Sequence, residues 1–272
     1  MATRERQRAG DVRVGVGGWT YEPWRGSFFP AGLAHDRELA YASRQLTAIE
    51  INGTYYRTQK PESFAKWRAE TPDGFVFSVK ASRYSTHQKV LANAGESIER
   101  FIQSGLFELG EKLGPVVWQF MATKRFDPDD FGAFLALLPR DVRGLALRHA
   151  VEVRHESFRD PSFLALARRH GVATVFADTD EYPSFADLTG DFVYARLMRT
   201  RPEIETGYAP DEIGHWADTA RRWAVGDDPD GVPRIEAPRA AGSPRDVFLF
   251  VISGAKERAP AAAQALIARL HG

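Results

Sequence analysis

Two ionisable residues close an apolar, strand-like segment near the middle of the sequence. The segment AVEVR at 150–154 carries Glu152 and Arg154, and alternation along a strand places both on the face opposite Val151 and Val153. A parallel strand that is covered on both faces is almost continuously apolar, so these two charges indicate a solvent-facing strand or a site. A carboxylate beside a guanidinium can form an ion pair, bind an anionic group or take part in proton transfer.

Polar residues also stand near the ends of the other strand-like segments. The set comprises Glu50, Asn52, Lys80, Gln119, Asp178, Arg196 and Ser253. The carboxyl ends of the strands meet at one end of a parallel barrel, so we expect these side chains to converge there with Glu152 and Arg154. Buried charges cost several kcal/mol each unless they are paired, and the acids and bases of this set can neutralise one another.

Lys80 is the residue whose type and position suggest the most chemistry. A lysine among apolar strand residues can form a Schiff base, donate a proton or hold an anion, and the structural alternative is a salt bridge to Glu50 or Glu152. Glu152 and Asp178 can divide general acid and base work if their surroundings separate their pKa values; otherwise they hold nearby arginines. His87, in the loop after the third strand, either reaches a substrate or is merely exposed.

Aromatic residues gather after the first strand-like segment, in WTYEPWRGSFF at 19–29, and Tyr55 and Tyr56 follow the second. Such rings stack on a sugar or a base, or they plug the top of the barrel. The expected catalytic residues are Glu50, Lys80, Glu152 and Asp178, and the expected substrate-binding residues are Trp19, Tyr21, Trp24, Asn52, Tyr55, His87, Gln119, Arg154, Arg196 and Ser253.

Cofactor motifs are absent from the sequence. Gly15 to Gly18 lack the full dinucleotide-binding spacing, and there is no phosphate loop, nucleophile elbow, zinc-protease motif or EF-hand loop. A divalent metal is possible among Glu50, Glu152, Asp178 and His87, but nearby cations compete for these carboxylates, so we assign no metal ligands. The turn from Ser253 to Lys256 suits an anion such as phosphate, although its signal is generic.

Composition restricts the class of protein. The 272 residues contain equal numbers of acidic and basic side chains, which gives no electrostatic reason to expect nucleic acid or membrane as a partner. The absence of cysteine excludes disulfides and thiolate chemistry. No apolar run approaches the roughly 20 residues that cross a bilayer, and the polar start MATRERQRAG lacks the apolar core of a signal peptide. We therefore expect a cytoplasmic protein.

The elements that must position these residues alternate along the chain. Apolar strand-like segments occur at 12–18, 48–52, 75–81, 115–120, 150–154, 173–178, 192–198 and 247–253. Helical periodicity fills most of the gaps, at 61–70, 97–114, 127–138, 160–171, 211–224 and 257–271.

This alternation predicts an α/β fold, a TIM-type (β/α) barrel that forms a single domain over 1–272. The segment 179–191 is too short and too turn-like for a full helix, so we expect an irregular crossover after the sixth strand. Residues 226–246 are rich in Pro, Gly and charge and predict a long loop, and residues 1–11 are expected to be flexible.

The same segments resemble the YecE-like family of TIM-barrel proteins, a domain of unknown function. The resemblance is carried by VGVGGWTYEPWRGSFFP (14–30), AIEINGTYYR (48–57), TPDGFVFSVKASRYSTHQKVL (71–91), KLGPVVWQF (112–120), EVRHESF (152–158), FADTD (176–180) and DFVYARL (191–197). It implies kinship with sugar-isomerase-like barrels. Where the family often has His-Gly after the seventh strand and an Asn-rich end after the eighth, this chain has Met198-Arg199-Thr200 and Ile252 to Lys256.

The resulting hypothesis is an enzyme that acts on a small polar substrate, sugar-like or anionic, in the barrel mouth. The reaction expected is an isomerase-like acid–base proton transfer. One alternative is a metal-dependent, phosphodiester-processing enzyme of the barrel nuclease type. Another is a non-catalytic ligand-binding or interaction protein whose mouth is filled by its own side chains.

Overall fold

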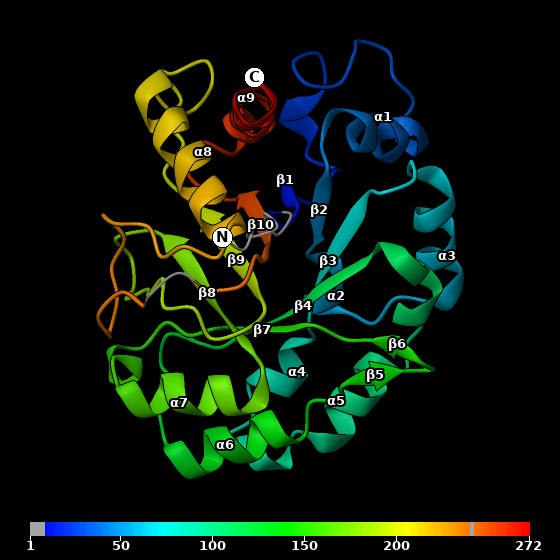
Figure 1. Ribbon diagram of the computed structural model, residues 1–272. Helices are drawn as coiled ribbons and strands as arrows, with labels where there is room; N and C mark the ends of the chain where they lie inside the picture. Colours follow the sequence, from blue (N-terminus) through cyan, green and yellow to red (C-terminus); the bar gives the residue numbers. More distant parts are fainter. Residues whose placement is uncertain (1–8, 240–241) are drawn as a thin grey trace, which may run out of the picture.

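Eight parallel strands close into a barrel (Figure 1). The computed structural model describes residues 9–239 and 242–272. Around the barrel the strands run in the order β1-β10-β9-β8-β7-β4-β3-β2, and helices surround them. This arrangement confirms the TIM-type barrel. The strands are β1 (Val12–Gly17), β2 (Ala48–Ile51), β3 (Val76–Lys80), β4 (Leu113–Gln119), β7 (His149–Glu152), β8 (Ala173–Asp178), β9 (Phe192–Leu197) and β10 (Asp246–Val251).

The longer helices begin and end where the sequence predicts. In α7 (Pro161–His170), the Asp160 side chain accepts a hydrogen bond from the Ser162 N–H at 2.8 Å, and Gly171 ends the helix in the left-handed conformation, with φ 66°. The other helices are α1 (Glu38–Gln45), α2 (Gly53–Tyr56), α3 (Pro61–Glu70), α4 (Arg83–Thr86), α5 (Gly95–Ile102), α6 (Pro128–Ala136), α8 (Pro210–Ala224) and α9 (Ala259–His271).

One predicted helix is wrong in its extent. The periodic segment 97–114 does not form one helix, because α5 ends at Ile102 and a 3₁₀ segment, Leu106–Lys112, follows it. Gly105 and Gly110 have φ of 119° and 55°, which an α-helix cannot contain. The apolar residues of both pieces are nevertheless buried against the same core. A small hairpin, β5 (Asp141–Val142) and β6 (Leu145–Ala146), was not predicted.

The connection between β8 and β9 contains no helix over residues 179–191, as expected for an irregular crossover. Residues 226–239 and 242–245 also carry neither helix nor strand. The expectation of a flexible segment over 1–11 falls largely on residues 1–8, outside the described residues. Within the part of the chain that the structure describes, no helix is long and apolar enough to cross a membrane.

Along most of the strands, alternate residues face two different apolar clusters. The larger cluster lies between the strands and the helices. The smaller one fills the barrel interior. Its buried residues are Ala48, Val76, Val117, Ala150, Ala173, Val175, Phe192, Tyr194, Phe248 and Phe250. On five strands the interior positions that follow, toward the carboxyl ends, are polar and form the site, whereas β8 and β10 continue with Ala177 and Ile252. The polar positions are Glu50, Lys80, Gln119, Glu152 and Arg196.

Candidate functional site

A buried guanidinium joins two carboxylates in the upper barrel interior. Arg196, on β9, donates to Glu50, on β2, from Nε at 3.1 Å and from Nη2 at 2.6 and 2.7 Å. Its Nη1 donates to Oε2 of Glu152, on β7. All three side chains are at most 2% exposed. The predicted convergence of Glu50, Glu152 and Arg196 is therefore present in the structure, and these residues pair with one another.

Neighbouring side chains complete the hydrogen bonds of both carboxylates. The Tyr194 hydroxyl donates to Glu50 Oε2 at 2.5 Å. Glu152 Oε1 accepts from Gln119 Nε2 at 2.8 Å, from Arg154 Nε at 2.7 Å and from the Tyr182 hydroxyl at 3.3 Å. Gln119 and Arg154, both predicted to bind substrate, thus act here by holding Glu152.

The pairing determines the charge state of Glu152. Burial alone would raise the pKa of Glu152, but the charges of Arg196, Arg154 and Lys80 outweigh burial and lower it. The carboxylate therefore stays ionised at neutral pH, and its oxygens are occupied by donors. Such a group is a fixed charge and is poorly suited to the acid–base role that the sequence suggested for it.

Lys80 lies beside this cluster without joining it. The structural alternative considered for Lys80 was a salt bridge to Glu50 or Glu152, yet within the described residues its ammonium has no carboxylate oxygen within 4.0 Å and no hydrogen-bond partner. It lies instead 4.3 Å from the centre of the Tyr55 ring. Burial, together with the nearby Arg196 charge, lowers the pKa of Lys80 to about 8.

Tyr55 also connects Lys80 to His87. The Tyr55 hydroxyl lies 2.9 Å from His87 Nε2, at hydrogen-bond distance. Burial and the charges of Arg83 and Lys80 lower the pKa of His87, so its ring is neutral at neutral pH. Tyr55 and His87, which were predicted separately as substrate-binding residues, therefore lie together next to the Lys80 amine.

Asp178 is not brought into this cluster, contrary to the expected convergence. It follows Phe176 on the outer face of β8, where Phe176 packs against Trp216 of α8. The Asp178 carboxylate pairs with Arg199 Nε at 3.1 Å. Burial raises the pKa of Asp178, so its environment does differ from that of Glu152, but the two carboxyl groups lie on opposite faces of the sheet.

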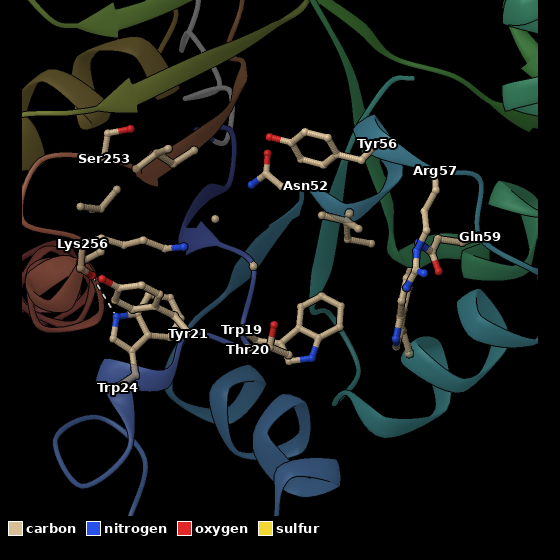
Figure 2. Close-up of a pocket in the computed structure, with 18 residues that line it drawn as sticks. Trp19, Thr20, Tyr21, Trp24, Asn52, Tyr56, Arg57, Gln59, Ser253 and Lys256 are labelled. Carbon is tan, nitrogen blue, oxygen red and sulfur yellow. Dashed lines mark hydrogen bonds between the residues drawn. The ribbon is translucent and has the colours of Figure 1, made fainter. Parts of the chain in front are cut away.

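A cavity of about 620 Å³ opens at the carboxyl ends of β1, β2 and β10. Figure 2 shows Trp19, Tyr21, Trp24, Asn52 and Ser253 around it. All five were predicted to bind substrate. Sequence reasoning weighed Tyr56 without selecting it and considered Lys256 only as part of the turn that suits an anion. It passed over Thr20, Arg57, Gln59 and Trp67, which also line the cavity.

The charge in this cavity has one sign. Arg57 and Lys256 lie on its opposite sides, and the Lys256 ammonium points inward, 4.3 Å from the centre of the Tyr21 ring (Figure 2). No Asp or Glu is among the described residues that line the cavity. Burial lowers the pKa of Lys256. Anions would therefore be favoured here over cations.

The aromatic loop is partly buried as a plug and partly open to the cavity. Trp24 is fully buried, and its Nε1 donates to the Lys256 carbonyl at 2.9 Å, which ties the loop to the start of the last helical segment. Trp19 and Tyr21 are only partly buried. Ser253, beside Lys256, has φ 70°, a conformation that costs energy in a residue other than glycine.

The donor groups do not fit a metal centre. Across 9–239 and 242–272, no three His, Asp or Glu side chains are grouped so that they could hold a metal ion. Glu50 and Glu152 accept their hydrogen bonds largely from arginine, which would repel a cation from the same oxygens. The geometry therefore gives no support to the metal-dependent alternative.

Comparison with known proteins identifies the family. The sequence model of the family described as "Protein of unknown function DUF72" matches residues 13–272. This chain belongs to the DUF72 family. It is 29% identical over 150 residues to the UPF0759 protein YecE of Escherichia coli K12; the match covers 54% of this chain and 50% of that relative, so the chain spans about half the length of the curated relative.

Solved structures of DUF72 proteins have the same fold. A family member from Thermotoga maritima MSB8 aligns with a TM-score of 0.72 and 21% identity, over 96% of this chain and 100% of that one. Another, from Enterococcus faecalis V583, aligns with a TM-score of 0.68 and 16% identity, over 96% of both chains. These likenesses concern the fold, and the chemistry of this DUF72 protein rests on its own residues.

Proposed function

We propose that this protein is an enzyme that binds a small anionic, sugar-sized compound in the barrel mouth and transforms it by proton transfer. The observation that carries the proposal is the cavity whose described lining includes Arg57 and Lys256 but no carboxylate. The Lys256 ammonium is partly buried and has no carboxylate partner among the described residues, so an anionic ligand would offset the cost of its desolvation. Arg57 is exposed and adds positive charge at the rim of the cavity.

The size and walls of the cavity agree with such a ligand. Its volume of about 620 Å³ lies within the range of roughly 300–1,000 Å³ that holds small molecules. Trp19 and Tyr21 offer ring faces, while Asn52 and Ser253 offer hydrogen bonds to hydroxyl groups.

Lys80 is the best-placed group for proton transfer. The register of β2 and β3 pairs Ile51 with Val79, so the next residues, Asn52 and Lys80, leave neighbouring strands side by side. Asn52 lines the cavity, and Lys80, which is not itself among the lining residues, follows the adjacent strand end. An amine with a pKa of about 8 can both accept and donate a proton near neutral pH, unlike the saturated carboxylates of Glu50 and Glu152.

A non-catalytic ligand-binding function is the second candidate. The complete internal pairing of Glu50, Glu152 and Arg196 favours it, because that cluster needs no ligand to satisfy its charges. If the protein is an enzyme nevertheless, its catalytic group in the described interior is Lys80, because Glu50 and Glu152 are paired with arginines.

A thermal-shift series tests the binding, with inorganic phosphate, sugar phosphates and the matching uncharged sugars as ligands. We expect sugar phosphates to raise the Tm of the wild type and of Lys66→Ala but not of Lys256→Ala. Lys66 is a suitable control because it is exposed, pairs with Glu70 and does not line the cavity. Stabilisation that is equal in Lys256→Ala, or absent from all proteins, would contradict the proposal.

Solvent deuterium exchange separates the two candidates. Incubation of a stabilising sugar phosphate with the protein in D₂O should place deuterium on a carbon next to the carbonyl, as seen by NMR, and Lys80→Met should abolish the incorporation. Binding without any exchange would favour the non-catalytic function.

A further inference from the structure

The surroundings of Lys80 leave its amine without a counter-ion, although two carboxylates lie in the same interior. Glu50 receives donors from Arg196 and Tyr194, and Glu152 receives them from Arg196, Arg154 and Gln119. The negative charges of the cluster are therefore matched by the two arginines. No acceptor on these carboxylates remains directed at Lys80 within 4.0 Å, in the part of the chain that the structure describes.

The Tyr55 ring covers one side of the amine. It lies 4.3 Å from the Lys80 nitrogen and is held by the contact of its hydroxyl with His87 Nε2. A ring face removes water from an ammonium without supplying a hydrogen-bond acceptor. Burial is the largest cause of the lowered pKa of Lys80, about 8, so a substantial fraction of the amine is neutral at pH 7 to 8.

We propose that Lys80 is a nucleophile that forms a Schiff base with a carbonyl group of the substrate. This deepens the proposed function and rests on it for the identity of the substrate, an anionic aldehyde or ketone. A neutral, desolvated lysine at the carboxyl end of a barrel strand is the kind of amine that carries out this reaction.

The step needs no oxidant, metal or other co-reactant. The lone pair of the Lys80 nitrogen forms a bond to the carbonyl carbon while the carbonyl oxygen takes up a proton. The resulting carbinolamine loses that oxygen as water, and the nitrogen gives up its protons so that a C=N bond remains. Protonation of this imine withdraws electrons from the neighbouring carbon, which makes its proton easier to remove, and the ionised Glu152 lies near enough to stabilise the cation.

Lys256 has a different position and, on this proposal, a different role. Its ammonium points into the cavity beside Tyr21, at the end formed by Ser253 (Figure 2). It does not belong to the barrel interior. Lys256 would hold the anionic group of the substrate while Lys80 reacts with the carbonyl.

Reductive trapping tests the proposal on the 272-residue chain. The first probe is pyridoxal 5′-phosphate, an anionic aromatic aldehyde, followed by borohydride; the second is formaldehyde with cyanoborohydride, which needs no phosphate site. Peptide mass spectrometry then gives the rate of modification of each lysine. With both probes at pH 7.5 we expect Lys80 to react at least about tenfold faster than the exposed Lys66, because a tenfold change in the neutral fraction accompanies each pKa unit.

Two variants keep the test interpretable. Tyr55→Ala exposes the amine to water and should slow the modification of Lys80 at least about tenfold, whereas Tyr55→Phe, which keeps the ring, should slow it less. Lys256→Ala should slow the modification of Lys80 by pyridoxal 5′-phosphate. It should leave the rate at which formaldehyde modifies Lys80 unchanged.

The outcomes distinguish this inference from the proposed function. If Lys80 reacts no faster than Lys66 with either aldehyde, or if Lys256 is modified and Lys80 is not, the Schiff-base proposal is wrong even where sugar phosphates stabilise the protein. If formaldehyde modifies Lys80 rapidly while no sugar phosphate binds, the reactivity of the Lys80 amine is confirmed and the proposed substrate class is wrong.

Discussion

Arg196 and Glu50 face each other across the barrel interior and share three hydrogen bonds, although 146 residues separate them in the sequence. Strands β9 and β2 are not neighbours, since β10 and β1 lie between them. The pair therefore ties opposite parts of the barrel together beneath the mouth. Because Glu50 and Glu152 are already paired with arginines, Lys80 has no ion-pair partner among the described residues.

Replacement of Arg196 by Met should destabilise the protein by about 3–5 kcal/mol, because it leaves Glu50 and Glu152 buried without their shared cation. Urea unfolding at pH 7 measures the change. The deficit should shrink toward pH 5, as the orphaned carboxyl groups take up protons in the folded state. Arg100→Met is the control: that exposed arginine pairs with the exposed Glu96 at the surface and should cost less than about 1 kcal/mol. Equal losses of unfolding free energy in the two variants would show that the interior ion pairs contribute no more to stability than a surface pair.

Replacement of Lys80 by Met should raise the free energy of unfolding at pH 7 by about 1–3 kcal/mol. The folded-state pKa of Lys80 is about 8 and the ordinary value is 10.5, so the unfolded chain binds more protons between these values and wild-type stability rises with pH across that window. The advantage of the variant should therefore shrink as pH rises from 8 to about 10. Denaturant unfolding at several pH values measures it. A difference that stays constant with pH would contradict the burial assigned to this amine.

His149 should make the protein sensitive to acid. Its Nδ1 accepts from Trp118 Nε1 at 3.0 Å and its Nε2 donates to the Pro139 carbonyl at 2.7 Å, so the buried ring is held neutral. Burial lowers its pKa from 6.5 to about 4. The unfolded chain binds the extra proton in this range, so up to about 3 kcal/mol of stability is lost as pH falls from 6.5 to 4.

The measurement for His149 is the pH dependence of unfolding in the wild type and in His149→Gln, whose amide can both accept and donate. The variant should lose less stability between pH 6.5 and 4. An NMR titration in which the His149 ring signals shift with a midpoint near 6.5 in the folded protein would show that the ring is not held neutral.

The barrel and much of its polar interior were predictable because a strand alternates its side chains with a period of two. Glu50, Lys80 and Gln119 follow apolar interior positions at that spacing, as do Glu152 and Arg196. Periodicity does not reveal which face of a strand is the interior, however, when both faces are apolar. In β8 the interior positions are Ala173 and Val175, so Asp178 falls on the outer face with Phe176.

The cavity was harder to predict because loops have no periodicity. Arg57 and Lys256 come from opposite ends of the chain and meet only when β1 pairs with both β2 and β10. Both residues lie in segments that the sequence had already marked, after the second strand and in the turn after the eighth. The signal that could have selected them is a cation beside aromatic residues in two loops that the barrel closure brings together.

A crystal structure with a stabilising sugar phosphate tests the central claim most directly, since it locates the anion that the mouth is proposed to bind. We expect the phosphate within hydrogen-bond distance of the Lys256 ammonium and the carbonyl end of the sugar directed toward Lys80. Density for the compound outside the cavity, or a phosphate that lies next to neither Lys256 nor Arg57, would contradict the account.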